Sequence, residues 1–387
     1  MVAMSRILRR SPVSIFSSLS GWKLFLAATT LLLLTRSFKL QTSSDNLSVF
    51  RSFTKESATI DLNKVCPSSA NKINASNDHL PYPKIMELEE IYSILKYWYE
   101  FKCAKVNATH TGENPASCNF HSIGQHLLHH AIELKETLLT VQVGAMDGIS
   151  NDPMFEMYGG RKQDHVGVQS FKDLRNWLPV MIEPVPTNFE ALIETYTEKI
   201  AKTKNLGCAV PINAAVSYDS SEETCPFCHT NTSESAPKVC TDLPDWKKFQ
   251  IGTLDCGYSK HYHKENFDLC IVQDPLPCSS ITNLLAERFL SSENIGMVQI
   301  DIEGYEYILL EGFMKELPDH LLPPVIHFER KVMVAQDEIY PLQEGKKRLK
   351  IAEDLMKSKG YALHHEGEDL LAIRVSGFRA SFDNVMS

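Results

Sequence analysis

Short apolar runs alternate with stretches of helical periodicity along the C-terminal two-thirds of the sequence. Apolar runs bounded by turn residues predict buried strands, whereas apolar residues three or four positions apart predict helices. The predicted strands are residues 138–145, 178–183, 208–216, 296–303 and 324–329, followed by a hairpin of residues 361–365 and 370–375. One predicted helix begins at the Asn151-Asp152-Pro153 cap, and the others are residues 187–196, 280–290, 305–314 and 344–358.

This alternation predicts a doubly wound α/β domain over residues 121–387. Strands that alternate with helices form a mainly parallel sheet with helices on both faces, and the hairpin adds antiparallel strands at one end. A long Cys-rich insertion at about residues 217–278 interrupts the alternation. Residues 41–120 are Ser-, Asn- and Lys-rich and predict a stem, with one amphipathic helix at residues 85–101.

The N-terminal residues 1–40 predict a cytoplasmic tail and a membrane anchor. Arg6, Arg9 and Arg10 precede an apolar run whose uncharged part is residues 24–34. A basic flank before an apolar run is typical of a signal anchor with its positive side in the cytoplasm. We therefore expect a single-pass type II membrane protein of the endoplasmic reticulum or Golgi apparatus. An Arg- and Ser-rich segment without acidic residues also fits a mitochondrial presequence, which is the alternative.

Composition supports a globular chain in an oxidising compartment. The chain has 387 residues, 43% of them hydrophobic, which suffices for a sizeable core. Its net charge of -9 argues against a nucleic-acid partner. All ten cysteines follow the predicted anchor, as expected for disulfides in a lumenal glycoprotein. Glycosylation sequons begin at Asn46, Asn74, Asn107 and Asn231.

The insertion contains a C-x-x-C motif formed by Cys225 and Cys228. Such a motif is half of a zinc site, which Cys240 could complete, but a second C-x-x-C is missing. Two local disulfides that hold the insertion are the favoured interpretation. Zinc, free thiols and a redox pair are the alternatives.

Candidate site residues follow the predicted strands, where open α/β sheets bind their ligands. Gly144 and Gly148 follow the first strand and would let a ligand approach the backbone, or would only form a tight turn. Glu183 follows the second strand and could accept hydrogen bonds from ribose hydroxyls, unless it is structural. Asp301 and Glu303 end the fourth strand; Asp301 is the stronger candidate because Glu303 also suits a helix N-terminus.

His327, near the end of the fifth strand, is either a catalytic group or a structural imidazole. No third ligand is evident beside Asp301 and Glu303, so no metal site is predicted.

Six segments resemble, in order and spacing, the FkbM-type methyltransferase family. They are VQVGAMDGISNDP, VMIEPVPTNFEAL, INAAVS, PCSSITNLL, VQIDIEGYEYILLEGF and PPVIHFE. The resemblance implies a Rossmann-like class I methyltransferase fold with S-adenosylmethionine as cofactor. By position, it implies that the methionine part contacts Gly144, Asp147 and Gly148, the ribose Glu183, and the adenine Asn213 and Ala214. It places Asp301 beside the reacting methyl group.

The expected function is methyl transfer to a hydroxyl of a small molecule or glycan of the secretory pathway, with Asp301 or His327 as the base. A membrane-tethered escort of a protein partner that has lost catalysis is the alternative. A dinucleotide oxidoreductase is disfavoured, because no G-x-G-x-x-G follows the first strand.

Overall fold

The computed structural model describes residues 84–103, 118–150, 152–159, 171–218, 223–288, 290–331, 333 and 344–377. The predicted anchor, most of the predicted stem, and the sequons at Asn46, Asn74 and Asn107 lie outside these residues. Within the described part, no helix has both the length and the apolar character needed to cross a membrane.

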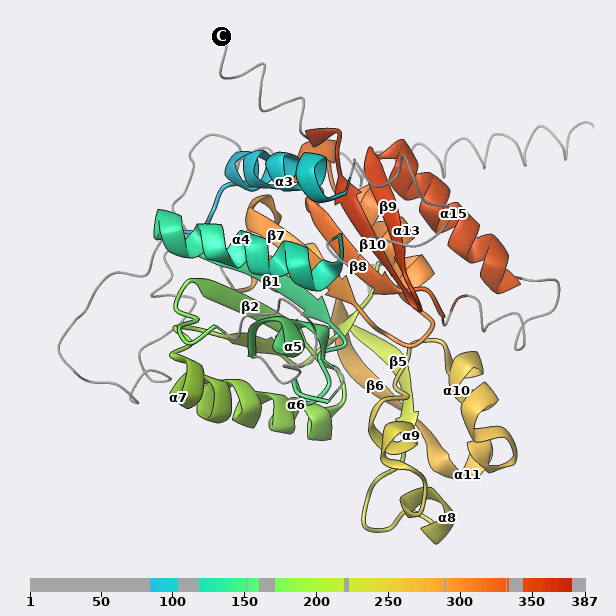
Figure 1. The fold of residues 1–387 in the computed structure, drawn as a ribbon. Coiled ribbons are helices and arrows are strands. Elements are labelled where there is room, and N and C mark those ends of the chain that lie inside the picture. The colour runs from blue at the N-terminus through green and yellow to red at the C-terminus, as the bar shows by residue number, and fades with distance from the viewer. Residues whose placement is uncertain are drawn as a thin grey trace, which may run out of the picture. The chain divides into compact units, whose positions relative to one another are not determined.

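A seven-stranded sheet forms the centre of the fold (Figure 1). The strand order is β3-β2-β1-β7-β8-β10-β9, and β10 runs antiparallel to both of its neighbours while the other pairs are parallel. This arrangement confirms the predicted doubly wound, mainly parallel sheet with a terminal antiparallel hairpin. The strands are β1 (Leu138–Val143), β2 (Trp177–Ile182), β3 (Val210–Ile212), β7 (Ile295–Ile300), β8 (Val325–Glu329), β9 (Tyr361–Glu366) and β10 (Asp369–Arg374).

Helices cover both faces of the sheet, because alternate strand residues point to opposite faces and both sets are apolar. One apolar core includes residues of α12 (Ile281–Ala286), α13 (Glu306–Glu316) and α15 (Glu344–Ser358). The other core includes residues of α3 (Leu88–Lys102), α4 (Phe120–Leu134), α5 (Pro153–Gly159) and α6 (Pro186–Ile193). Beyond α6 the helix continues as a π-helical segment (Glu194–Ile200) and α7 (Ala201–Lys204).

The structure differs from the predicted elements in three places. Residues 208–216 form two short strands, β3 and β4 (Ala215–Val216), which belong to different sheets. Strand β7 ends at Ile300, so Asp301 and Glu303 lie in the loop after it. Helix α4 was not predicted; it begins at an Asn119 cap whose side chain accepts a hydrogen bond from the Ser122 N–H.

The insertion forms a small sheet of its own with the order β4-β6-β5. Three disulfides connect its segments, Cys225–Cys278, Cys228–Cys256 and Cys240–Cys270. Local disulfides are therefore confirmed, three rather than the expected two, and they use all three cysteines considered for zinc. The other elements are β5 (Thr224–Thr230), α8 (Lys238–Thr241), α9 (Asp245–Phe249), α10 (Cys256–His263), α11 (Phe267–Cys270) and β6 (Ile271–Ser279).

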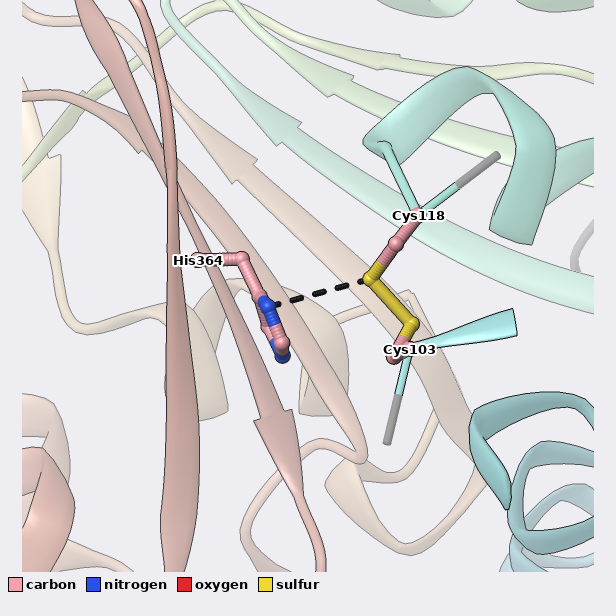
Figure 2. Close-up of side chains that lie close together, drawn as sticks. All are labelled: Cys103, Cys118 and His364. Atoms are coloured by element: carbon pink, nitrogen blue, oxygen red, sulfur yellow. Dashed lines mark hydrogen bonds between the residues drawn. A yellow bond between two sulfur atoms is a disulfide. The ribbon is translucent and has the colours of Figure 1, made fainter. Parts of the chain in front are cut away.

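A further disulfide, Cys103–Cys118, connects the end of α3 to the segment before α4 (Figure 2). Both cysteines are buried, and the Cys118 sulfur lies 3.7 Å from Nδ1 of His364 on β9. The disulfide thereby holds the two helices together at the sheet edge. Cys208 also forms a disulfide, whose partner lies outside the described residues.

Replacing both cysteines of this bridge, Cys103→Ser with Cys118→Ser, should lower the free energy of unfolding. The bridge spans 15 residues, and closing a loop of that length stabilises a chain by about 3 kcal/mol. Urea unfolding of the oxidised proteins measures the difference. An unchanged unfolding midpoint would show that packing of α3 alone holds this region.

Candidate functional site

A hollow opens at the carboxyl ends of β1, β2 and β7, where the sheet topology switches direction. The chain winds from β1 through β2 to β3 on one side and from β7 to β8 on the other. Crevices at such switch points are the usual ligand sites of open α/β sheets. The hollow has a volume of about 660 Å³, including the solvent at its mouth.

The turn after β1 depends on Gly144. Its φ of 81° lies in the left-handed region, and a Cβ there would overlap the carbonyl oxygen of Asp301. The Gly144 N–H donates to the Ile182 carbonyl on β2, and the Asp301 N–H donates to the Val143 carbonyl. Gly144 therefore lets three strand ends converge, and it lines the hollow.

Asp147 and Gly148 shape the next turn instead of lining the hollow. The Asp147 carboxylate accepts hydrogen bonds from the Ile149 and Ser150 N–H groups and from the Ser150 hydroxyl. Gly148 has a φ of 70° and packs against Tyr196. Both positions support the loop from which Met146 and Ser150 face the hollow.

Glu183 lies at the end of β2 and lines the hollow, although it is only 4% exposed. Its Oε2 accepts the Met146 N–H at 2.8 Å, and its Oε1 accepts the Val185 N–H at 2.9 Å. Burial raises its pKa to about 7. A carboxylate accepts about four hydrogen bonds, so Glu183 keeps capacity for a ligand while it fixes the loops beside it.

The two positions predicted to border an adenine have different roles. The Asn213 side chain donates to the Glu183 and Pro184 carbonyls, at 2.9 and 3.1 Å, and so holds the β2 loop. Ala214 lines a second, smaller hollow. Gly144, Pro184, Phe227 and Ile302 line both hollows, which are therefore adjacent.

Asp301, Glu303 and Glu329 bring their carboxylate oxygens within 4.8 Å of one another. Asp301 and Glu303 line the hollow, and Glu329 ends β8. Burial raises the pKa of Asp301 to about 6 and that of Glu329 to about 10, and it raises that of Glu303 well above its usual range. Sequence analysis missed Glu329, although its place at a strand end was a usable signal.

His327 lies on β8 two residues before Glu329 and does not line the hollow. Its ring stacks on Phe120 with centroids 4.2 Å apart. Its Nε2 lies 3.8 Å from Glu366 and 3.9 Å from Asp369. Burial lowers the pKa of His327 to about 3, so the imidazole is neutral. This placement favours the structural interpretation.

Acceptor groups dominate the inner wall of the hollow. Gln142 and Asp152 are each 3% exposed, and Gln142 Oε1 and Asp152 Oδ2 have no hydrogen-bond partner. The other Asp152 oxygen caps α5 by accepting the Phe155 N–H. Among the described residues, no Lys, Arg or His lines the hollow. The site is thus suited to a ligand that donates hydrogen bonds and carries positive charge.

The insertion supplies the opposite wall. Phe227, Phe249, Gln250 and Gly252 line the hollow from β5, α9 and the loop after α9. The Tyr258 hydroxyl on α10 is hydrogen-bonded to Glu303 and lies 2.9 Å from the Tyr262 hydroxyl. Residues of the disulfide-bonded insertion therefore help to build the site, which the sequence pattern did not indicate.

Comparison with known proteins yields only remote structural similarities. No protein-family model and no curated protein matches the chain. The precorrin-6y C5,15-methyltransferase of Geobacter metallireducens GS-15 is 11% identical, with a TM-score of 0.25 over 69% of this chain and 93% of its own. Cofactor-bound Rv0187 from MTB is 10% identical, with a TM-score of 0.30 over 70% and 95%. The strand order, and not these similarities, carries the fold assignment.

The buried wall of the hollow predicts a pH-dependent stability difference. Burial raises the pKa of Asp152 to about 7, so the folded chain keeps this proton at pH values where the unfolded chain has lost it. That contribution to stability is complete below the unfolded pKa and is lost as the pH rises towards 7, by up to about 1.4 kcal/mol per pH unit.

Asp152→Asn preserves the helix cap and removes the titration. We expect the wild-type free energy of unfolding, relative to this variant, to fall as the pH rises from 5 to 7. Contributions of groups such as His327 cancel in the difference. A difference that is constant with pH would contradict the buried, protonated state of Asp152.

Proposed function

We propose that this chain is an S-adenosylmethionine-dependent methyltransferase. The observation that carries the proposal is the acceptor-lined hollow at the switch point of the sheet, which has no basic lining residue in the described part. Dinucleotide and phosphate sites present basic groups or N–H-rich glycine loops to their anions. S-Adenosylmethionine has no phosphate, and its sulfonium and ammonium groups, which outweigh its single carboxylate, suit a wall of carboxylate and amide oxygens.

The parts of the cofactor find suitable groups around the hollow. The unpartnered Asp152 Oδ2 suits the ammonium group, because a buried acceptor without a donor is costly. Glu183 has lone pairs left for the ribose hydroxyls. The smaller hollow, lined by Ala214, Leu254 and Tyr305, is apolar enough for the adenine ring. These assignments retain Gly144, Glu183 and Ala214 as direct contacts and give Asp147, Gly148 and Asn213 supporting roles.

Bound S-adenosylmethionine would supply an electrophilic methyl group, so the chain needs mainly to align an acceptor with it. Asp301 lines the hollow and is placed to hold an acceptor hydroxyl and receive its proton. The hydroxyl of Tyr258 is hydrogen-bonded to Glu303. It therefore places a phenol of the insertion beside the carboxylates of Asp301 and Glu303. His327 lies outside the lining, on β8, and stacks on Phe120 instead.

We infer that the acceptor is a hydroxyl compound of the secretory pathway, such as a glycan, and that an N-terminal anchor tethers the domain to the membrane. Support comes from the oxidised cysteines within the described residues and from the arginine-flanked apolar run. A folded chain that fails to bind S-adenosylmethionine would instead be an escort protein.

Replacing Glu183 by glutamine should weaken binding of S-adenosylmethionine. The substitution removes the charge that strengthens hydrogen bonds to the ribose, a loss of about 10- to 100-fold in affinity. Calorimetric titration of the purified full-length chain measures the effect. Glu190→Gln, on the exposed face of α6, is the matched control and should bind like wild type. Equal affinities of the wild type, Glu183→Gln and Glu190→Gln would show that Glu183 does not contribute to cofactor binding.

Asp301→Asn should retain cofactor binding and lose methyl transfer by about 10²- to 10⁴-fold. Transfer of labelled methyl groups from S-adenosylmethionine to glycan and lipid hydroxyls measures the rate. Asp354→Asn, at an exposed position of α15, is the charge-matched control. Full transfer by Asp301→Asn would assign the proton acceptor elsewhere.

A further inference from the structure

The carboxylates of Asp301, Glu303 and Glu329 have the spacing of cation ligands. Their ligand oxygens all lie within 4.8 Å of one another. Metal–oxygen bonds of about 2.4 Å allow two ligands of one cation to be at most about 4.8 Å apart. The three residues come from the ends of adjacent strands, because Asp301 follows β7 and Glu329 ends β8.

Negative charge accumulates at this position without matching cations among the described side chains. Asp369 lies opposite Glu329 in the register of β10 and β8, and Glu306 begins α13 three residues after Glu303. Lys331 is the nearby cation, but its ammonium group is 2.7 Å from the Glu368 carboxylate. Carboxylates that are partly buried together are costly unless a cation joins them.

A second, independent feature is a row of buried polar residues that lies two residues before Asp301 and Glu329 along β7 and β8. Gln142, Gln299 and His327 occupy one row across β1, β7 and β8 in the strand register. Because the three are direct register partners, they point to the same face of the sheet. All three are less than 5% exposed, and Gln142 Oε1, Gln299 Oε1 and His327 Nδ1 have no hydrogen-bond partner.

Of these atoms, Gln142 Oε1 points to a hydrated ligand, because Gln142 is the one of the three residues that lines the hollow. Buried acceptors without donors are rare and require a partner, and Gln142 faces the same hollow as Asp301 and Glu303. Waters bound to a cation can only donate hydrogen bonds, and second-shell acceptors of this kind orient metal sites. An acidic cluster that was only exposed to solvent would not need buried hydrogen-bond acceptors beside it.

We propose that Asp301, Glu303 and Glu329 bind a hard divalent cation, such as Mg²⁺, Mn²⁺ or Ca²⁺, beside the acceptor position of the hollow. The ligand set is all oxygen, which favours these ions over zinc or copper. Gln142, which lines the same hollow, accepts hydrogen bonds from the waters of the cation.

The role of the cation rests on the proposed methyl transfer, whereas its binding does not. A hydroxyl bound to a divalent cation loses its proton more readily. Asp301 can ligate the cation through one carboxylate oxygen and receive that proton through the other. The site then selects acceptors that offer a hydroxyl with a neighbouring oxygen to complete the coordination shell, as vicinal diols of glycans do.

Titration of the full-length, chelator-treated protein with MnCl₂ tests the site without cofactor or acceptor. Free Mn²⁺ is followed by electron paramagnetic resonance at pH 7.5. We expect one saturable site per chain, competition by Mg²⁺ or Ca²⁺, and binding weakened at least about tenfold in Glu329→Gln. Glu287→Gln, which removes the same charge at an exposed position, should bind like wild type.

The absence of saturable Mn²⁺ binding to folded wild-type protein would overturn the proposal, whatever the variants do. Equal affinity in Glu329→Gln would also overturn it, because the ligands would then lie elsewhere. Calorimetry with S-adenosylmethionine on the same samples separates the two proposals: cofactor binding without Mn²⁺ binding removes only the cation site.

Discussion

The close approach of β1 and β7 at their carboxyl ends is the constraint on which the site depends. Gly144 permits it, because any side chain at that position would meet the Asp301 carbonyl. The same contact sets the positions of the loop after β1 and of the carboxylates after β7. Hydrogen bonds from Gly144 to β2 and from Asp301 to β1 extend it across three strands. The hollow is therefore a consequence of backbone packing and is formed before any ligand binds.

The Cys-rich insertion forms one part of the wall of the hollow, and the strand ends of the sheet form the other. Its β4 follows β3 directly, so the insertion starts where the sheet ends, beside Ala214. Three disulfides reinforce the small apolar cluster of so small a unit. They hold β5 and α9, from which Phe227 and Phe249 line the hollow. The insertion lines both hollows, through Phe227 in each and Leu254 in the smaller one.

Hydrophobic periodicity sufficed to predict the parallel sheet and the hairpin, because both faces of the sheet are buried and each strand is a short apolar run. It failed for residues 208–216, where Asn213 turns inward to bond the β2 loop and divides one apolar run into two strands. Hydrophobic periodicity also failed to predict α4, because its many histidines make the apolar face of this helix less evident in the sequence. Strand ends singled out Glu183 and Asp301 and could have singled out Glu329, whereas Gln142 and Asp152 became significant only through contacts between distant segments. The spacing of residues along one strand cannot show which polar groups on other strands lack a hydrogen-bond partner.

A crystal structure of the protein grown with S-adenosylmethionine is the most direct test of the central claim that this hollow binds the cofactor. The account predicts density across both hollows, with the ribose within hydrogen-bonding distance of Glu183 and the ammonium group beside Asp152. Clear density for both residues with no cofactor between them, at a saturating concentration, would contradict it. Cofactor bound elsewhere on the molecule would contradict it equally.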